Sequence, residues 1–126
     1  MSVVLDASAL LAYLHDEPGS EAVEKVLSEA MISTVNLAEV IQKAMARSVD
    51  VQGLRQDLEA LGLSIIPFTA TQAEGAAQLW QKTHAFGLSL GDRACLSLGL
   101  ELALPVLTAD QEWRRLELGL EIQLIR

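Results

Sequence analysis

Four acidic residues carry the clearest chemistry in this sequence: Asp6, Glu39, Asp92 and Asp110. Asp6 and Asp110 each end a short apolar run of the kind that forms a buried strand. Glu39 and Asp92 lie in the first turn or so of predicted helices. Because the carboxyl ends of parallel strands meet at one edge of a sheet, we expect the four acids to converge there. The pattern therefore predicts one pocket that binds metal ions.

The electrostatics of such a pocket favour a hard cation. Two ionised carboxylates about 5 Å apart repel by roughly 3 kcal/mol at an effective dielectric constant of about 20. All the candidate ligands are oxygens, with no His or Cys beside them, which favours Mg²⁺ or Mn²⁺ over zinc. Such an ion activates water and stabilises the departing oxygen of a phosphodiester. Phosphodiester hydrolysis is the chemistry that we expect.

Each acid also has a purely structural alternative. Asp6 and Asp110 could be N-terminal caps of helices, and Asp92 could complete a capping box with the serine three residues before it. Glu39 could pair with the lysine one turn further on. Taken singly the residues leave these alternatives open, and only their joint placement at one edge of a sheet favours a site.

The elements that must position the acids alternate along the chain. We expect strands at 3–5, 31–33, 64–68, 105–110 and 122–125, and helices at 7–14, 20–27, 34–48, 50–61, 71–84 and 89–102, with another through 113–116. The expected caps are Ser20, Ser33 or Thr34, Thr71 and Ser89. Strands separated by helices predict an α/β fold with a mainly parallel five-stranded sheet and helices on both faces.

Composition limits the class of protein. A chain of 126 residues with 51% hydrophobic but only 4% aromatic residues predicts one domain, spanning 1–126, with an aliphatic core. This apolar content favours a homodimer. The single Cys95 and the absence of a leader favour the cytoplasm. Glu101 and Pro105 interrupt the most apolar stretch, so we expect no membrane span.

The charge is strongly acidic. Nine basic against seventeen acidic residues give a net charge of −8, which argues against general electrostatic binding of nucleic acid. Any nucleic-acid binding must therefore depend on a local basic patch or on bound cations. No glycine-rich phosphate loop is present, which disfavours nucleotide binding of the P-loop kind.

Four segments resemble, in order, the motifs of a PIN domain, and more narrowly those of the VapC ribonuclease toxins of type II toxin–antitoxin modules. They are 5–8 (LDAS), 33–39 (STVNLAE), 88–95 (LSLGDRAC) and 107–110 (LTAD) with Trp113. The resemblance implies a PIN-like α/β/α sandwich and a Mg²⁺- or Mn²⁺-dependent endoribonuclease that acts on structured RNA such as tRNA. It also implies a homodimer and a cognate antitoxin that blocks the site.

The resemblance assigns roles to the matched residues. Asp6, Glu39, Asp92 and Asp110 become the catalytic and metal-binding quartet, with Asp6 and Asp92 foremost as direct ligands. The hydroxyls of Ser8 and Thr108 would orient carboxylates or water. Which acid positions the attacking water stays open. The alternative function is a catalytically silent PIN-like binding module in a regulatory complex, and a phosphatase or receiver-like domain ranks below it.

Basic residues near the acids are candidates for RNA contacts. Lys43 and Arg47 follow Glu39 at intervals of four, so they either guide RNA phosphates or form a solvated ladder of ion pairs. Arg93 could contact phosphate, balance the charge of the pocket or pair at the surface. Arg114 and Arg115 could frame the entrance.

Five remaining residues are predicted to have structural roles only. Trp80 and Trp113 fall on apolar helix faces and are expected in the core. His15 and His84 lie near turns, where we expect neither ligands nor general bases. Cys95 is expected to pack inertly.

Overall fold

The central feature of the fold is a parallel five-stranded sheet, described here by a computed structural model covering residues 2–126. The strand order is β3-β2-β1-β4-β5, and every neighbouring pair is parallel. The strands are β1 (Val3–Leu5), β2 (Ala30–Ser33), β3 (Ser64–Ile66), β4 (Val106–Thr108) and β5 (Ile122–Leu124). The predicted parallel α/β sheet is confirmed. Because β1 lies between β2 and β4, the segments that follow these three strands start side by side.

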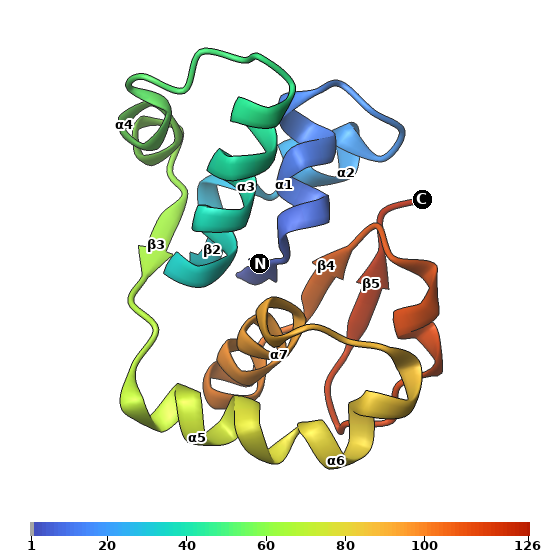
Figure 1. Cartoon of the computed structure of the whole chain (residues 1–126). Coiled ribbons are helices and arrows are strands. Elements are labelled where there is room, and N and C mark those ends of the chain that lie inside the picture. The colour runs from blue at the N-terminus through green and yellow to red at the C-terminus, as the bar shows by residue number, and fades with distance from the viewer. Residues whose placement is uncertain (1) are drawn as a thin grey trace.

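Helices cover both faces of this sheet. Figure 1 shows α1 to α4 together in the upper part of the view and α5 to α7 in the lower part. The α-helices are α1 (Ala7–Leu14), α2 (Ser20–Glu24), α3 (Thr34–Ala46), α4 (Leu54–Ala60), α5 (Ala70–Gln78), α6 (Trp80–Thr83) and α7 (Leu90–Leu102). Short 3₁₀ helices are η1 (Leu27–Glu29), η2 (His84–Phe86) and η3 (Gln111–Arg115).

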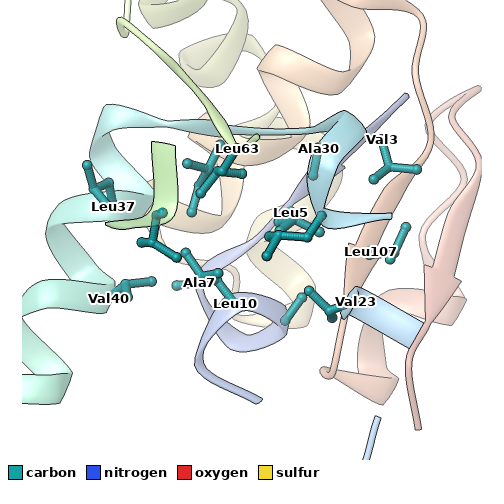
Figure 2. Close-up of a cluster of buried hydrophobic side chains, with 14 residues drawn as sticks. Val3, Leu5, Ala7, Leu10, Val23, Ala30, Leu37, Val40, Leu63 and Leu107 are labelled. Atoms are coloured by element: carbon teal, nitrogen blue, oxygen red, sulfur yellow. The ribbon is translucent and has the colours of Figure 1, made fainter. Parts of the chain in front are cut away.

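Alternation along the strands divides the core in two. Val3 and Leu5 of β1 join the cluster drawn in Figure 2, which packs against α1 to α4. Val4 joins a second cluster with Leu96 of α7 and Trp113. Successive side chains of a strand point to opposite faces, so a strand buried on both faces reads as a continuous apolar run. This explains why β1, Val3–Leu5, contains no polar residue.

The structure corrects the expected helix 71–84. Thr69 caps α5 by accepting a hydrogen bond from the Gln72 amide at 3.1 Å, so Thr71 is not the cap. The helix then breaks, and α6 and η2 replace its second half. Leu79, at the break, is buried, while Trp80 is 52% exposed and stacks on His84 at 4.2 Å between ring centroids. The prediction of a buried Trp80 is therefore wrong, because it assumed one unbroken helix.

Other expected boundaries also shift. Gly19, not Ser20, precedes α2, and its backbone is left-handed at φ +96°. The helix expected from Asp50 begins only at Leu54, because the Asp50 carboxylate accepts a bond from the Gln52 amide in a local turn. Ser33 caps α3, and the expected last helix is the 3₁₀ helix η3.

Several packing predictions are confirmed. Trp113 is fully buried, and Cys95 is buried and forms no disulfide. Within residues 2–126, no helix is both long enough and apolar enough to cross a bilayer.

Two glycines with left-handed backbones give a matched test of the packing between α4 and η1. A Cβ on Gly62 (φ +103°) would lie 2.7 Å from the Cα of Ser28, whereas a Cβ on Gly53 (φ +78°) would meet nothing within 4 Å. In each variant, an alanine in the left-handed backbone conformation destabilises the protein by about 1–2 kcal/mol. We expect the clash to lower the free energy of unfolding of Gly62→Ala by roughly a further 1–3 kcal/mol. Urea denaturation measures the stability of both variants. Equal losses would show that the backbone at Ser28 moves away from the new Cβ without a measurable cost.

Candidate functional site

Asp6 is the best-defined member of the acidic site, the name used below for Asp6, Glu39, Asp92 and Asp110. It follows β1 directly and caps α1, with Oδ1 accepting a hydrogen bond from the Ala9 amide at 2.8 Å. The Ser8 hydroxyl donates to Oδ1 at 2.7 Å, and the Thr108 hydroxyl donates to Oδ2 at 2.5 Å. The structure thus places both predicted hydroxyls, from the first turn of α1 and the end of β4, against one buried carboxylate.

Burial makes the charge of Asp6 costly. The side chain is buried, and this desolvation raises its pKa from 3.8 to about 6. Hydrogen bonds from Thr108, Ala9 and Ser8 oppose the rise, and the nearby Asp92 carboxylate adds to it. A buried carboxylate whose pKa stays high despite three donors is one that a cation would stabilise.

Glu39 is bonded by Asn36 of its own helix, α3, and Asn36 in turn is bonded to α7. The Asn36 side-chain amide donates to Glu39 Oε1 at 2.8 Å and to the backbone oxygen of Gly91 at 2.9 Å. Gly91 lies in α7, and a Cβ there would come within 2.6 Å of Glu39 Oε1. The absence of a side chain at Gly91 therefore lets α7 approach the Glu39 carboxylate. The alternative pairing of Glu39 with Lys43 is not found among the described residues.

Asp92 takes the structural role that the sequence left open. Its amide donates to the Ser89 hydroxyl at 3.1 Å, and its Oδ2 accepts from the Ser89 amide at 3.0 Å, which completes a capping box at the start of α7. This confirms Ser89 as the cap. The bond uses only Oδ2 of the carboxylate, so the capping role leaves Oδ1 for another partner.

The buried thiol of Cys95 lies within the electrostatic influence of three of the acids. Burial raises the pKa of its thiol well above the usual range, and the charges of Asp6, Asp92 and Glu39 each add to the rise. Three acids from three different elements therefore act on one point of α7. Together with the Asp92 effect on Asp6, this places them in one electrostatic group.

Asp110 is connected to these acids indirectly, through Thr108. Its carboxylate caps η3 by accepting from the Glu112 amide at 3.0 Å, and its own amide donates to Thr108 Oγ1 at 3.0 Å. Thr108 in turn donates to Asp6. The side chain of Asp110 is exposed, so the structure connects it to Asp6 through Thr108 rather than by direct contact.

The donor atoms of the acidic site suit a hard cation, but their positions do not form a complete coordination site. Its donors are carboxylate oxygens, which Mg²⁺ and Mn²⁺ prefer. Within residues 2–126, however, no three His, Cys, Asp or Glu side chains stand as a complete metal-binding group.

The predicted basic residues have different fates. Arg93 donates to the Ala76 backbone oxygen at 2.9 Å and so ties α7 to α5. The bond uses only one guanidinium nitrogen, so a contact of Arg93 with RNA stays a prediction. Arg115 pairs with Glu112 at 3.3 Å. Lys43 and Arg47 are exposed and line a cleft that includes Ser8.

Asn36 is the site residue that sequence reasoning missed. It is 1% exposed, and its side chain links the Glu39 carboxylate to the α7 backbone. A signal was present, because Asn36 stands three residues before Glu39 and so shares its helix face. A buried amide beside a carboxylate on that face indicates that the carboxylate is being positioned.

The raised pKa of Asp6 gives a stability prediction with a defined sign. Because the folded state binds the Asp6 proton more tightly than the unfolded state, the stabilisation by this proton is complete below about pH 4 and is lost as the pH rises through about 6. Asp6→Asn removes the buried charge. We expect the variant to be more stable than the wild type at about pH 7, by up to ~3 kcal/mol, with the gain vanishing near pH 4.

Thermal unfolding across this pH range measures the effect. Asp110→Asn is the matched control, since it removes the same charge from an exposed side chain and should give no comparable gain. A wild-type protein that is as stable as Asp6→Asn at neutral pH would show that the Asp6 carboxylate is well solvated.

Comparison with known proteins places this geometry in a family. The sequence matches the PIN domain family over residues 3–118. A relative named Ribonuclease VapC, from Mycolicibacterium smegmatis, is 26% identical over 121 residues, covering 89% of this chain and 94% of its own length.

Solved structures share the fold. DNA-bound VapBC from Salmonella typhimurium superposes with a TM-score of 0.74 at 17% identity, covering 100% of this chain and 99% of that one. A toxin–antitoxin complex from Klebsiella pneumoniae gives 0.77 at 20% identity and 98% of both chains. VapC20 from Mycobacterium tuberculosis, described as a sarcin-ricin loop cleaving toxin, gives 0.71 at 12% identity, with 94% and 98% covered. With the family match spanning most of its length, the chain belongs to the PIN domain family.

Proposed function

We propose that this protein is an endoribonuclease of the VapC type, the toxin of a type II toxin–antitoxin module, acting as a single PIN domain. The observation that carries the proposal is the buried Asp6 carboxylate at the end of the central strand, with Glu39 and Asp92 in the same electrostatic group. The relative named Ribonuclease VapC and the family match support RNA as the substrate. Structured RNA such as tRNA is the substrate class that we favour.

In this proposal the reaction depends on Mg²⁺ or Mn²⁺, which supplies an activated water and stabilises charge on the departing oxygen. Asp6 and Asp92 bind the cation, with Glu39 and Asp110 completing the acidic site. Ser8 and Thr108 fix the two oxygens of Asp6, and Asn36 fixes Glu39. The carboxylates thus hold their orientation while the RNA is cleaved.

The proposed assembly contains a second copy of the chain and a cognate antitoxin. Large apolar side chains are exposed on helices and on the segments that follow α3 and α4, and covering them would favour association. They are Met45, Val49, Leu61, Trp80, Leu90, Leu100 and Leu102. The structural relatives from Salmonella typhimurium and Klebsiella pneumoniae are toxin–antitoxin complexes. The acidic site suits an antitoxin segment with basic side chains. We place the protein in the cytoplasm, where its RNA substrates lie.

A catalytically silent binding module is the second candidate. One observation favours it: no three acids among residues 2–126 form a complete metal-binding group. Such a module would keep the fold and the antitoxin contact but would leave RNA intact.

Cleavage of RNA separates the two functions. Purified protein is incubated with total RNA in Mg²⁺, in Mn²⁺ and in chelator, alongside Asp6→Asn and Asp92→Asn. Asp57→Asn is the matched control, because Asp57 is also an aspartate in the first turn of a helix, α4, but lies outside the acidic site. We expect discrete fragments only with metal, and a loss of at least about 100-fold in both site variants.

The control should cleave like the wild type. If the folded wild-type protein leaves every RNA intact under all conditions, the ribonuclease proposal fails and the binding module takes its place.

A second prediction concerns the space that Gly91 leaves for Glu39. Gly91→Ala brings a Cβ within 2.6 Å of Glu39 Oε1, so the carboxylate must move, and we expect cleavage to fall by at least about tenfold. Gly75→Ala is the control, because its Cβ would come equally close to the Ser97 hydroxyl, at 2.6 Å, outside the acidic site. Cleavage rates and thermal unfolding of both variants are compared. Equal activity in the two would mean that Glu39 does not need its observed position.

A further inference from the structure

A cleft of about 370 Å³ opens beside the acidic site between α1, α3 and the chain after β5. We call it the cationic cleft. Its lining residues are Ser8, Leu11, His15, Glu17, Lys43, Ala46, Arg47 and Arg126. Apart from that of Ser8, none of these side chains belongs to the acidic site or bonds to it, so their charges call for a separate explanation.

The charge of the cationic cleft is opposite to that of the protein. Three cationic side chains, those of Lys43, Arg47 and Arg126, line the cleft with one carboxylate side chain, that of Glu17, in a chain whose net charge is −8. His15 also lines the cleft, and its Nε2 is buried with no hydrogen-bond partner among the described residues. A local excess of cations is what an acidic protein needs in order to hold a polyanion.

The carboxylate of Glu17 holds both arginines loosely. Its Oε1 lies 3.5 Å from the Arg126 guanidinium and its Oε2 lies 3.6 Å from that of Arg47. Hydrogen bonds between guanidinium and carboxylate are usually about 2.7–2.9 Å long, so these are ion pairs without tight bonds. Each guanidinium has five N–H donors, and most of them stay available to another anion. Arg126 is also anchored to the Pro18 backbone oxygen at 2.9 Å.

Ser8 connects the cationic cleft to the acidic site. Its side chain lines the cleft, and its hydroxyl donates to both Asp6 oxygens, at 2.7 and 2.9 Å. A phosphodiester chain with one phosphate at the acidic site therefore passes next to the cleft. Guanidinium groups bind phosphate in two-pronged fashion, and Arg47 and Arg126 supply two of them.

We propose that the cationic cleft binds a phosphate of the RNA chain that neighbours the phosphate being cleaved, and that this phosphate displaces Glu17 from the two arginines. The proposal rests on the ribonuclease function. While no RNA is bound, the Glu17 carboxylate keeps the two arginines in place. When RNA binds, its phosphate replaces the Glu17 carboxylate as the anion paired with them.

The test measures RNA binding without cleavage, in the Asp6→Asn background and constant Mg²⁺. A fluorescein-labelled single-stranded RNA is titrated with protein at several salt concentrations, and its anisotropy gives Kd. The cleft variants are Arg47→Ala and Glu17→Gln. The Arg55–Glu59 pair provides matched controls, since its atoms lie 3.8 Å apart and Arg55 is 58% exposed against 56% for Arg47.

The cleft variants should move affinity in opposite directions. Arg47→Ala should raise Kd about tenfold through loss of a charged hydrogen bond. It should also reduce the slope of log Kd against log salt by about 0.7. Glu17→Gln should lower Kd, because it removes the competing carboxylate. Arg55→Ala and Glu59→Gln make the same charge changes on α4 and should leave Kd close to that of the background protein.

Several outcomes overturn the proposal. It fails if cleft and control variants shift Kd equally, which would reflect net charge alone. It also fails if Arg47→Ala keeps its RNA affinity but loses the antitoxin on co-purification, which would assign the cleft to a protein partner. Lys43→Ala serves as the second variant if Arg47→Ala unfolds, since the structure places no ion pair on Lys43 within residues 2–126.

The same measurements separate this proposal from the ribonuclease function. If the wild type cleaves RNA while the cleft variants bind like their controls, only the cationic cleft is wrong. If the wild type neither cleaves nor binds RNA, both proposals are wrong.

Discussion

The burial of one carboxylate, that of Asp6, is the constraint on which the site depends. The side chain sits at the end of the central strand, where the sheet and α1 exclude water, and three hydrogen-bond donors do not fully replace the lost solvation. Ser8, Thr108 and the Ala9 amide all aim at it. A fold selected for stability alone would place a neutral residue here. The carboxylate is retained at a cost that function explains.

The remaining acids are arranged by secondary structure rather than by each other. Asp92 belongs to a helix cap, Asp110 caps η3, and Glu39 is held by Asn36. Each thus has a partner of its own, which keeps several like charges at one edge of a sheet without leaving any of them unsatisfied. The structural alternatives for Asp6, Asp92 and Asp110 are therefore real, and they coexist with the proposed function. In Asp92 and Asp110 the capping bond uses one carboxylate oxygen, whereas in Asp6 the second oxygen is bonded by Thr108.

Local pattern was enough to predict much of this arrangement. The strand before Asp6 and the cap at Ser89 depend on neighbouring residues only, so they could be read directly. Asn36 could not be given its role, because its second partner, Gly91, comes from a helix packed across α3. Trp80 was misplaced because nothing local marks the break at Leu79. The pairing of Glu17 with Arg126 joins distant parts of the chain, and no sequence period reports such a contact.

The strand order has a consequence for how the protein becomes active. β1 pairs with β4, and the hydrogen bond from Thr108 to Asp6 spans 102 residues. Contacts between residues so far apart form slowly, because the long loop must close before any pairing stabilises it. Helices such as α1 and α3 can form early, but the pair that orients Asp6 needs the sheet to be nearly complete. A partly folded chain therefore carries its acids without their geometry, and ribonuclease activity of the proposed kind would arise only at the last stage of folding.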